Sequence, residues 1–264
     1  MPEKYTLTTL ADGVYTNTAN WVGGVAPVAN DDVLFQFGSA QSLTGSDQSG
    51  TELDDITILP TCSGDAGSAD TYLQLDQGAA NSVVYAGGGT WYLDMGTAGS
   101  TEVRVDRTRT ASQGNAGLYF KNDTNPITTF DVVAGVVRLV SANITTLVVR
   151  SDATVIIDAA CTVGTIQIEG GTLEDLGAAV TTINQSGGVV TQKGADAYTL
   201  NQYGGTFYND GTGTATVNLY GGIFDSERDG RAKSVTLTQT GGTAKLSANV
   251  TLTDTFNTAV TITA

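Results

Sequence analysis

The stretch from residue 167 to residue 249 repeats a glycine doublet at a nearly constant spacing, and this period restricts the fold more than any other feature. The doublets are Gly170-Gly171, Gly187-Gly188, Gly204-Gly205, Gly221-Gly222 and Gly241-Gly242. Successive doublets are 17, 17, 17 and 20 residues apart. A fixed period with matched residues at matched offsets is the signature of a stacked repeat.

Each repeat is too short for a pair of helices, and its apolar residues alternate as they do in a strand. Residues 199–203 and 206–208, on either side of one doublet, are rich in threonine and aromatic residues, which suit a pleated strand. Glycine permits a positive φ or a close backbone approach, so the doublets are expected at corners. The repeats therefore predict an all-β fold, a parallel β-solenoid (β-helix) with coils of about 17–18 residues stacked about 4.8 Å apart.

Stacking places equivalent residues of successive coils in columns, and the residue types give each column an expected direction. One apolar column should point inward, a second apolar column repeats with the same period, an amide column can hydrogen-bond along the stack, and a column with two tyrosines should point outward beside the corner. The inward column is Ile166, Ile183, Leu200, Val217 and Leu237, and the second apolar column is Leu173, Val190, Phe207, Phe224 and Ala244. The amide column is Asn184, Asn201 and Asn218, and the outward column is Ser186, Tyr203, Tyr220 and Thr240.

A fifth column mixes polar and apolar residues: Ile168, Gln185, Gln202, Leu219 and Gln239. Exchange of Gln with Ile and Leu indicates a half-buried position, or a wall that something else covers. We therefore expect Gln185, Gln202 and Leu219 to form a free side through which the chain self-associates, most simply as a trimer. The candidate interface consists of these three residues with Trp21, Tyr203 and Tyr220.

The composition argues against several functions. The chain has 12 basic and 27 acidic residues, a net charge of −15, whereas nucleic-acid binding needs clustered Lys and Arg. It has no His, the commonest general base and metal ligand. The sequence also has no Asp-x-Asp-x-Asp-Gly loop and no glycine-rich nonapeptide of the calcium β-roll type, so no cofactor or metal is expected.

The two cysteines and the N-terminal residues bear on the compartment. Cys62 and Cys161 are too far apart in sequence for a metal-binding spacing or a disulfide framework, and we expect two buried thiols. The first residues lack the basic and then apolar pattern of a signal peptide, and no apolar run approaches the length of a membrane span. We therefore expect a chain that is made and folded in a cytoplasm and has no membrane partner.

Residues 1 to about 50 differ from the repeat, and residues 20–35 within them carry a resemblance. Asn20-Trp21, Gly23-Gly24, Pro27 and Asp31-Asp32 precede an apolar strand that starts at Val33. This segment resembles those that open many parallel β-helix proteins, among them secreted bacterial adhesins and virion proteins of tailed bacteriophages, of the decoration or fibre type. In such a segment the Trp would cap the open apolar end of the first coil, the glycines and Pro would bend the chain, and the Asp pair would start the first strand.

The regularity of the repeat predicts three segments along the chain. Residues 1–50 form a capping or attachment segment, residues 51–129 form irregular solenoid coils, and residues 130–264 form the regular solenoid with a C-terminal cap. The general preference for right-handed connections, with no six-residue subrepeat in the coils, favours a right-handed solenoid.

The walls of the solenoid offer three candidate surfaces, each with a simpler alternative. Asp94, Glu102, Arg104, Asp106, Arg107 and Arg109 could form a carboxylate–Arg patch of the type found in polysaccharide-degrading β-helix enzymes, although such alternation is ordinary on a solvated strand. Glu169, Glu174 and Asp175 are scattered, whereas glycoside hydrolysis needs two carboxylates at a set separation. Trp91, Tyr92, Tyr203, Tyr208, Tyr220 and Phe224 could form a stripe for sugar or protein contact, or could simply pack the wall. The charged residues 225–231 could be a solvated loop or a contact loop for a partner.

These features leave three hypotheses for function. The leading one is a non-enzymatic structural protein of a tailed-phage virion, a capsid decoration or cement protein assembled in the host cytoplasm, with the major capsid protein or other virion proteins as partners. The second is a receptor-binding tail fibre, a spike or a surface adhesin that binds glycans through the aromatic stripe. The third is a polysaccharide-degrading β-helix enzyme.

Overall fold

The computed structural model describes residues 3–38, 42–44, 47–77, 82–96, 102–106, 116–122 and 125–256. The chain divides into two compact units, residues 1–143 and 144–264. The strands within each unit pair in parallel, and the one helical segment in the described residues is the 3-10 turn η1 (Thr18–Asn20), so the prediction of an all-β parallel solenoid is confirmed. No helix in these ranges is long and apolar enough to cross a membrane. The three predicted segments and the right-handed sense stay predictions.

The first unit is a solenoid with uneven coils. Its strands are β1 (Glu3–Tyr5), β2 (Asp32–Phe35), β3 (Ser42–Leu43), β4 (Asp47–Leu53), β5 (Ile56–Ile58), β6 (Asp65–Ala66), β7 (Leu73–Gln77), β8 (Ser82–Tyr85), β9 (Trp91–Asp94), β10 (Glu102–Val105), β11 (Leu118–Lys121) and β12 (Ile127–Ser141). One column of parallel pairs contains β1, β2, β5, β8, β10 and β12, and another contains β3, β6, β9, β11 and β12. Strand β4 pairs with β7, and β7 pairs with β9. The coils differ in length because the loops that connect their strands have different lengths.

The N-terminal segment caps the core of this unit with aromatic side chains. Trp21 is 2% exposed, and its Nε1 donates a hydrogen bond of 2.8 Å to the carbonyl of Tyr15. Its ring meets the ring of Tyr15 edge-on at 5.2 Å and that of Phe35 at 6.1 Å. This contact confirms that Trp21 covers the apolar end of the coil. The prediction that Trp21 also belongs to an interface is wrong, because burial leaves its ring no free surface.

The turns of the cap follow the predicted roles of its other residues. Gly23 and Gly24 both have positive φ, at 84° and 67°, and bend the chain directly after Trp21. The buried side chain of Asn20 accepts hydrogen bonds from the backbone of Ala11 and Asp12 and donates to the carbonyl of Val14. Strand β2 begins at Asp32, as expected. The cap is therefore held by side-chain hydrogen bonds to its backbone as well as by aromatic packing.

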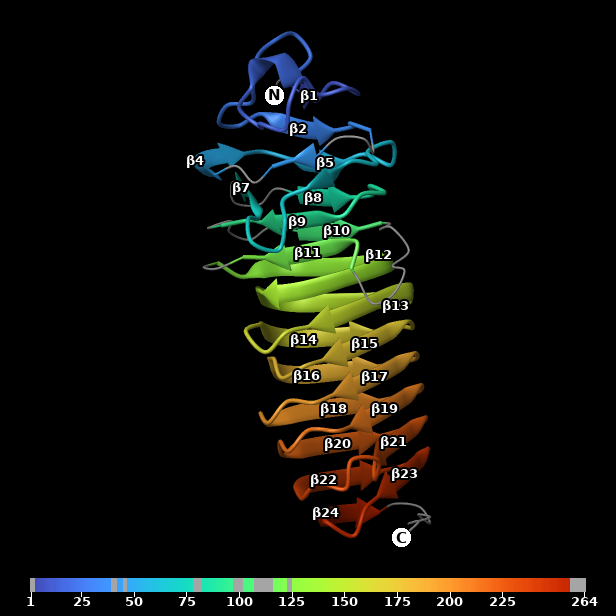
Figure 1. Ribbon diagram of the computed structural model, residues 1–264. Coiled ribbons are helices and arrows are strands. Elements are labelled where there is room, and N and C mark those ends of the chain that lie inside the picture. Colours follow the sequence, from blue (N-terminus) through green and yellow to red (C-terminus); the bar gives the residue numbers. More distant parts are fainter. Residues whose placement is uncertain are drawn as a thin grey trace. The chain divides into compact units, whose positions relative to one another are not determined.

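The second unit is a solenoid of even coils (Figure 1). Its strands are β13 (Asn143–Ile157), β14 (Thr162–Ile168), β15 (Thr172–Asp175), β16 (Ala179–Gln185), β17 (Val189–Gln192), β18 (Tyr198–Gln202), β19 (Thr206–Asn209), β20 (Ala215–Leu219), β21 (Ile223–Ser226), β22 (Lys233–Gln239), β23 (Thr243–Leu246) and β24 (Val250–Phe256). The even-numbered strands from β14 to β24 pair in one column, and the odd-numbered strands from β13 to β23 pair in the other. Each coil thus contributes one strand to each wall.

The register of the second unit confirms the predicted columns. Ile183 lies beside Leu200, and Leu200 beside Val217, a step of 17 residues in each case. Val190 lies beside Phe207, and Phe207 beside Phe224. All members of the two apolar columns are at most 1% exposed. Burial of these residues accounts for the core, since each large apolar side chain stabilises a fold by about 1.5–3 kcal/mol.

The glycine doublets form the corner between the two walls for two separate steric reasons. A Cβ added to Gly187 would lie 2.7 Å from the carbonyl oxygen of Glu169 in the preceding coil. Gly188 has a φ of +68°, and a Cβ there would lie 2.5 Å from the carbonyl oxygen of Gly171. The first glycine therefore permits close stacking, and the second also permits the left-handed turn. The positive φ and the close backbone approach expected at the corners are both confirmed.

The mixed fifth column points into the molecule at the corner, so the predicted free side of Gln185, Gln202 and Leu219 is wrong. All three residues are 0% exposed. The Gln185 Nε2 donates to the carbonyls of Gly187 and Gly188 at 3.1 and 3.2 Å. The Gln202 Nε2 donates to the corresponding carbonyl of Gly205 and, at 2.9 Å, to that of Ile223. These amides are buried because they satisfy carbonyl groups that the corner turns inward.

Candidate binding surface

Large apolar side chains are exposed at two places in the described residues. In the first unit they are the aliphatic residues of the capping segment, and in the second unit they lie at the corner beside the glycine doublets. The cap residues are Leu7, Val14, Val22, Val25 and Val28, and the corner residues are Val189, Tyr203 and Tyr220. Exposed apolar side chains are candidate contact residues, so we consider these two places for binding.

The corner of the second unit presents a stack of two tyrosine rings. Tyr203 and Tyr220 are 58% and 49% exposed, their ring centroids are 4.8 Å apart, and their planes differ by 7°. The strand alternation explains their direction, because Gln202 points inward and the next residue must point outward. The prediction that this column faces solvent is confirmed.

An amide ladder runs beside the tyrosine stack on the same wall. The Asn218 Nδ2 donates to the Asn201 Oδ1, and the Asn201 Nδ2 donates to the Asn184 Oδ1, both at 2.8 Å. The predicted hydrogen bonding along this column is therefore confirmed. The ladder has a direction: each amide donates toward the preceding coil, so the Nδ2 of Asn184 at its end faces the coil that contains Gln167.

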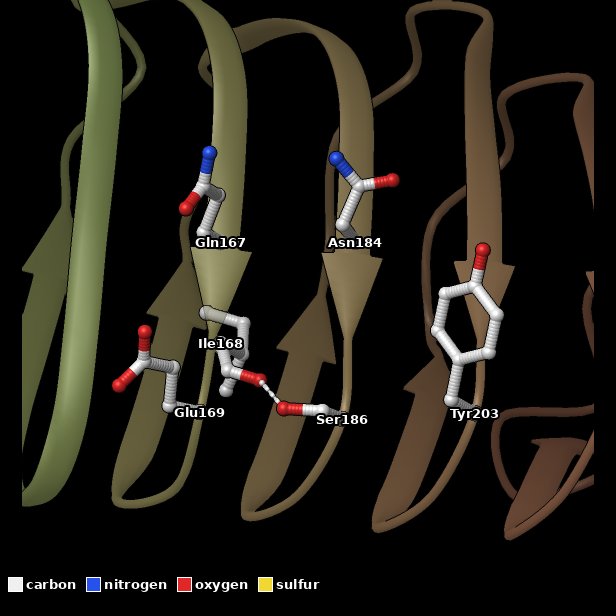
Figure 2. Close-up of a pocket in the computed structure, with 6 residues that line it drawn as sticks. All are labelled: Gln167, Ile168, Glu169, Asn184, Ser186 and Tyr203. Atoms are coloured by element: carbon white, nitrogen blue, oxygen red, sulfur yellow. Dashed lines mark hydrogen bonds between the residues drawn. The ribbon is translucent and has the colours of Figure 1, made fainter.

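A hollow of about 230 Å³ lies where the tyrosine stack and the amide ladder end (Figure 2). Gln167, Ile168, Glu169, Asn184, Ser186 and Tyr203 line it. The hollow exists because the outward column changes from Tyr203 to the much smaller Ser186 in the preceding coil. The Ser186 Oγ donates to the carbonyl of Ile168 at 3.1 Å, and Glu169 forms an ion pair of 2.7 Å with Arg150.

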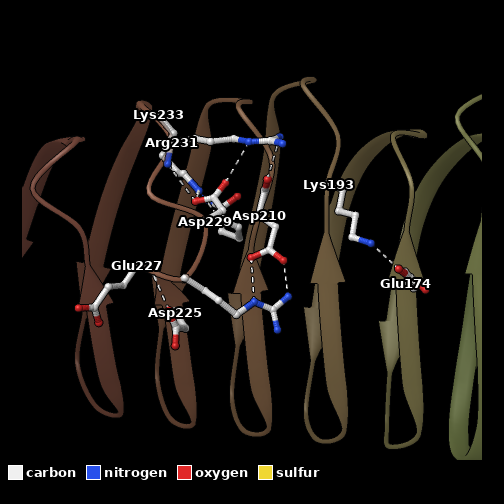
Figure 3. A network of polar contacts seen from close by, with 10 residues as sticks. Glu174, Lys193, Asp210, Asp225, Glu227, Asp229, Arg231 and Lys233 are labelled. Atoms are coloured by element: carbon white, nitrogen blue, oxygen red, sulfur yellow. Dashed lines mark hydrogen bonds and ion pairs between the residues drawn. The ribbon is translucent and has the colours of Figure 1, made fainter.

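A network of charged side chains covers the corner of the second unit that lies opposite the glycine doublets (Figure 3). The coil that is three residues longer than the others has its extra residues here. Arg228 pairs with Asp210 of the preceding coil, and its guanidinium lies 4.0 Å from the centre of the Tyr208 ring. Lys193 pairs with Glu174 at 2.5 Å. The loop at residues 225–231 is therefore fixed to the wall by its own side chains, although several of its residues remain exposed.

One ion pair in this network is buried. The Lys233 side chain is 0% exposed, and its Nζ lies 2.7 Å from the Asp229 carboxylate. It also donates to the carbonyl of Asn209. Burial alone would raise the pKa of Asp229, but the hydrogen bonds from Lys233 and the backbone of Arg231 and the nearby positive charges lower that pKa below its usual value. The pair holds the base of the loop rather than a site open to ligands.

Several of the residues predicted as enzyme candidates pair with a neighbour in the structure, and two lie outside the described residues. Arg104 pairs with Asp106 on the exposed side of β10, while Arg107 and Arg109 are not among the described residues. Asp175 is buried, and it accepts hydrogen bonds from the backbone of Gly177 and Ala178. Burial raises the pKa of Asp175 in spite of those two bonds.

The predicted aromatic stripe is only partly correct. Trp91 and Phe224 are fully buried and belong to the cores of their units, because each stands at an inward position of its strand. Tyr208 lies under Arg228. Tyr203 and Tyr220 remain exposed, and Tyr92 stacks on Tyr119 with centroids 4.3 Å apart. The prediction of two buried thiols is confirmed for Cys62 and Cys161.

Sequence reasoning missed the second corner of each coil. There the Gln192 Oε1 accepts a hydrogen bond of 2.6 Å from the backbone of Gly194, just as Asp175 accepts from Gly177. The Gln192 Nε2 donates to Asp175 at 3.1 Å, and Asn209 lies beside Gln192 in the next coil. The sequence does contain a pattern for this corner, since the carboxylate or amide residues at 175, 192 and 209 each stand two positions before a glycine.

Comparison of the chain with protein-family models, with curated proteins and with solved structures found no match. The described residues contain no group of three or more His, Cys, Asp or Glu side chains placed to hold a metal ion.

Proposed function

We propose that this chain is a non-enzymatic structural protein of a tailed-phage virion, most simply a decoration or cement protein that docks on the capsid shell. Its partners in this proposal are the major capsid protein or other virion proteins, and its location is the particle. Two sources support the proposal: the resemblance of residues 20–35 to the opening segments of virion β-helix proteins, and the surface of the cap.

The observation that carries the proposal is the set of exposed aliphatic side chains on the capping segment. Val22, Val25 and Val28 are each more than half exposed, at 53%, 51% and 60%, although a buried Trp and a buried Asn fix the surrounding backbone. A fixed surface can bind without the entropy cost of ordering a loop. Apolar side chains at such a place favour a protein partner, because contact removes them from water.

Particle analysis tests this proposal. Cultures that carry the coding sequence are induced, particles are purified, and the chain is located by mass spectrometry and electron microscopy. We expect many copies on the shell. Absence of the chain from particles, with the full amount in the particle-free fraction, would refute the proposal.

A matched pair of variants tests the docking surface. Val25→Asp places a charge in the cap surface and should abolish incorporation into particles. Val189→Asp changes an exposed valine of the second unit, 38% exposed, and should leave incorporation unchanged. Equal incorporation of both variants would show that the cap does not dock.

Self-association remains part of the proposal, with a trimer as its simplest form, but it loses the surface that the sequence assigned to it. Gln185, Gln202 and Leu219 are buried and cannot contact a second copy. Sedimentation of the isolated chain tests the proposal directly. A monomer at high concentration would refute it.

A second candidate function is favoured by one specific observation, the exposed stack of Tyr203 and Tyr220. Aromatic residues are enriched at binding interfaces, and this stack suits a receptor-binding fibre, spike or adhesin that contacts glycans. Particle analysis separates the candidates, because a fibre or spike should occur in few copies at the tail.

A further inference from the structure

The tyrosine stack ends at a position where the next aromatic ring is missing. Tyr220 covers one face of the Tyr203 ring. In the preceding coil the equivalent position is Ser186, because Gln185 lies directly beside Gln202 in the register of β16 and β18. Ser186 is too small to cover the other face of Tyr203, and that face borders the hollow in Figure 2. A flat ring entering the hollow would occupy the place of the missing tyrosine.

The rest of the lining is polar and has unused hydrogen-bonding capacity. In the described part of the chain, Gln167 has no side-chain hydrogen bond, and Asn184 uses only its Oδ1, as the acceptor from Asn201. The amide nitrogen of Asn184 points toward the coil of Gln167 (Figure 2). Glu169 uses one carboxylate oxygen in its pair with Arg150. The hollow therefore offers free donors and free acceptors next to an open aromatic face.

We propose that this hollow is a binding site for one neutral pyranose ring of a saccharide. A pyranose has a C–H face that can stack on the Tyr203 ring and a rim of hydroxyl groups that both donate and accept hydrogen bonds. The rim would meet Gln167, Asn184 and Glu169, the polar groups that give such sites their specificity. An aromatic side chain would fit the Tyr203 face but would leave these polar groups without partners, at a cost in affinity.

Charge and size narrow the ligand class. Arg150 neutralises Glu169 at 2.7 Å, and the chain as a whole carries a net charge of −15, so an acidic sugar would find no attractive field. The volume of about 230 Å³ is below the roughly 300–1,000 Å³ of pockets that enclose drug-sized ligands. One sugar ring, at the end or in the middle of a longer glycan, matches both limits.

The inference stands apart from the docking of the cap on a shell, and it supplies the ligand class for the fibre or adhesin alternative. The probes are the methyl pyranosides of glucose, galactose, mannose, rhamnose and N-acetylglucosamine. Saturation-transfer NMR with the full chain should show binding of at least one of them, with a dissociation constant in the millimolar range expected for a single ring. Absence of transfer to every probe would overturn the inference.

Two substitutions of equal chemistry locate the site. Ser186→Tyr supplies the missing ring and fills the hollow, so it should weaken saccharide binding at least tenfold. Thr240→Tyr extends the same column at its other end, beyond Tyr220, and should leave binding unchanged. Equal binding by both variants would overturn the inference, and their melting temperatures report whether each is folded.

A second pair keeps the test independent of how Ser186→Tyr folds. Tyr203→Ala removes the stacking face and should abolish transfer, whereas Tyr220→Ala leaves the face of Tyr203 that borders the hollow. Retained binding by Tyr203→Ala would overturn the inference. Failure of these tests would not alter the incorporation of the chain into particles, so it would leave the proposed virion function standing.

Discussion

Tyr203 and Tyr220 lie one above the other, with ring centroids 4.8 Å apart and planes 7° from parallel. This distance equals the spacing of paired strands, about 4.8 Å, so the rings report the register of the strands that carry them. A slip of one residue would turn a tyrosine inward and a buried glutamine outward. The stack is thus a consequence of the 17-residue coil as well as a candidate contact surface.

The two glycines of a corner should tolerate substitution far less than a glycine in an open turn. Gly188→Ala adds a Cβ 2.5 Å from the Gly171 carbonyl oxygen at a φ of +68°, and should lower the free energy of unfolding by several kcal/mol, about 3 or more, through strain and overpacking. Gly230→Ala has a similar φ, +63°, but nothing within 4 Å, and should cost only about 1–2 kcal/mol. Urea unfolding of both variants measures the difference, and equal costs would contradict the corner geometry.

The buried amide of Gln202 should act through its donor group. Gln202→Glu keeps the shape but removes the donor to the carbonyls of Gly205 and Ile223 and buries a charge, so we expect a loss of about 3 kcal/mol or more. Gln202→Leu should lower the free energy of unfolding by about 1 kcal/mol or less. A leucine fits this column, since Leu219 occupies it in the next coil, and the substitution also removes the Oε1 of Gln202, which is buried without a hydrogen-bond partner. Chemical unfolding measures both, and an equal effect would argue against the hydrogen bonds to the corner.

The buried phenol of Tyr198 should make the second unit less stable at alkaline pH. Burial, together with the charge of Asp175, raises the pKa of Tyr198 above its ordinary 10.0. As the pH rises, the unfolded chain therefore loses this proton before the folded chain does. The contribution of Tyr198 to the free energy of unfolding is fully present below about pH 10 and falls as the pH rises above it. Tyr198→Phe should reduce that fall.

The same substitution should raise stability at neutral pH. The Tyr198 hydroxyl is buried without a hydrogen-bond partner among the described residues, and its removal should gain about 1 kcal/mol. Unfolding of the wild type and Tyr198→Phe at pH 7 and pH 11 measures both effects. A destabilised Tyr198→Phe chain at pH 7 would indicate that the hydroxyl has a partner.

Lys233 should stabilise the charged network far more than Arg231 does. Lys233→Met leaves the Asp229 carboxylate and the Asn209 carbonyl without their buried partner, at an expected cost of about 3 kcal/mol. Arg231 is 60% exposed and 3.8 Å from Asp229, so Arg231→Met should cost about 1 kcal/mol or less. Thermal unfolding compares the two, and similar losses would contradict the burial of the Lys233 pair.

The sequence predicts the regular part of the fold well because the coils repeat the same chemistry. The glycine doublets, the apolar columns that contain Ile183 and Val190, and the outward Tyr203 and Tyr220 all follow from the period and from strand alternation. The capping role of Trp21 also follows from its place before a glycine bend and the first strand. These features depend on residue type and spacing alone.

The candidate site was harder to predict because it depends on contacts between coils. The glutamines look half-exposed when they alternate with Ile and Leu, and only the inward carbonyls of the corner explain their burial. The polar residues that line the hollow, such as Gln167 and Asn184, belong to different coils. Their relation to Tyr203 depends on the small size of Ser186, and no motif marks it.

Cross-linking across one coil tests the central claim, that each glycine doublet is the corner of one turn of a parallel solenoid. In Ser186→Cys with Tyr203→Cys, the two cysteines stand at the same place in adjacent coils, about 4.8 Å apart and within disulfide range. Under mild oxidation we predict a disulfide between them, located by mass spectrometry. In Ser186→Cys with Tyr220→Cys, two coils apart and roughly 10 Å distant, we predict none. A disulfide in the second pair, or its absence in the first, would contradict the solenoid register.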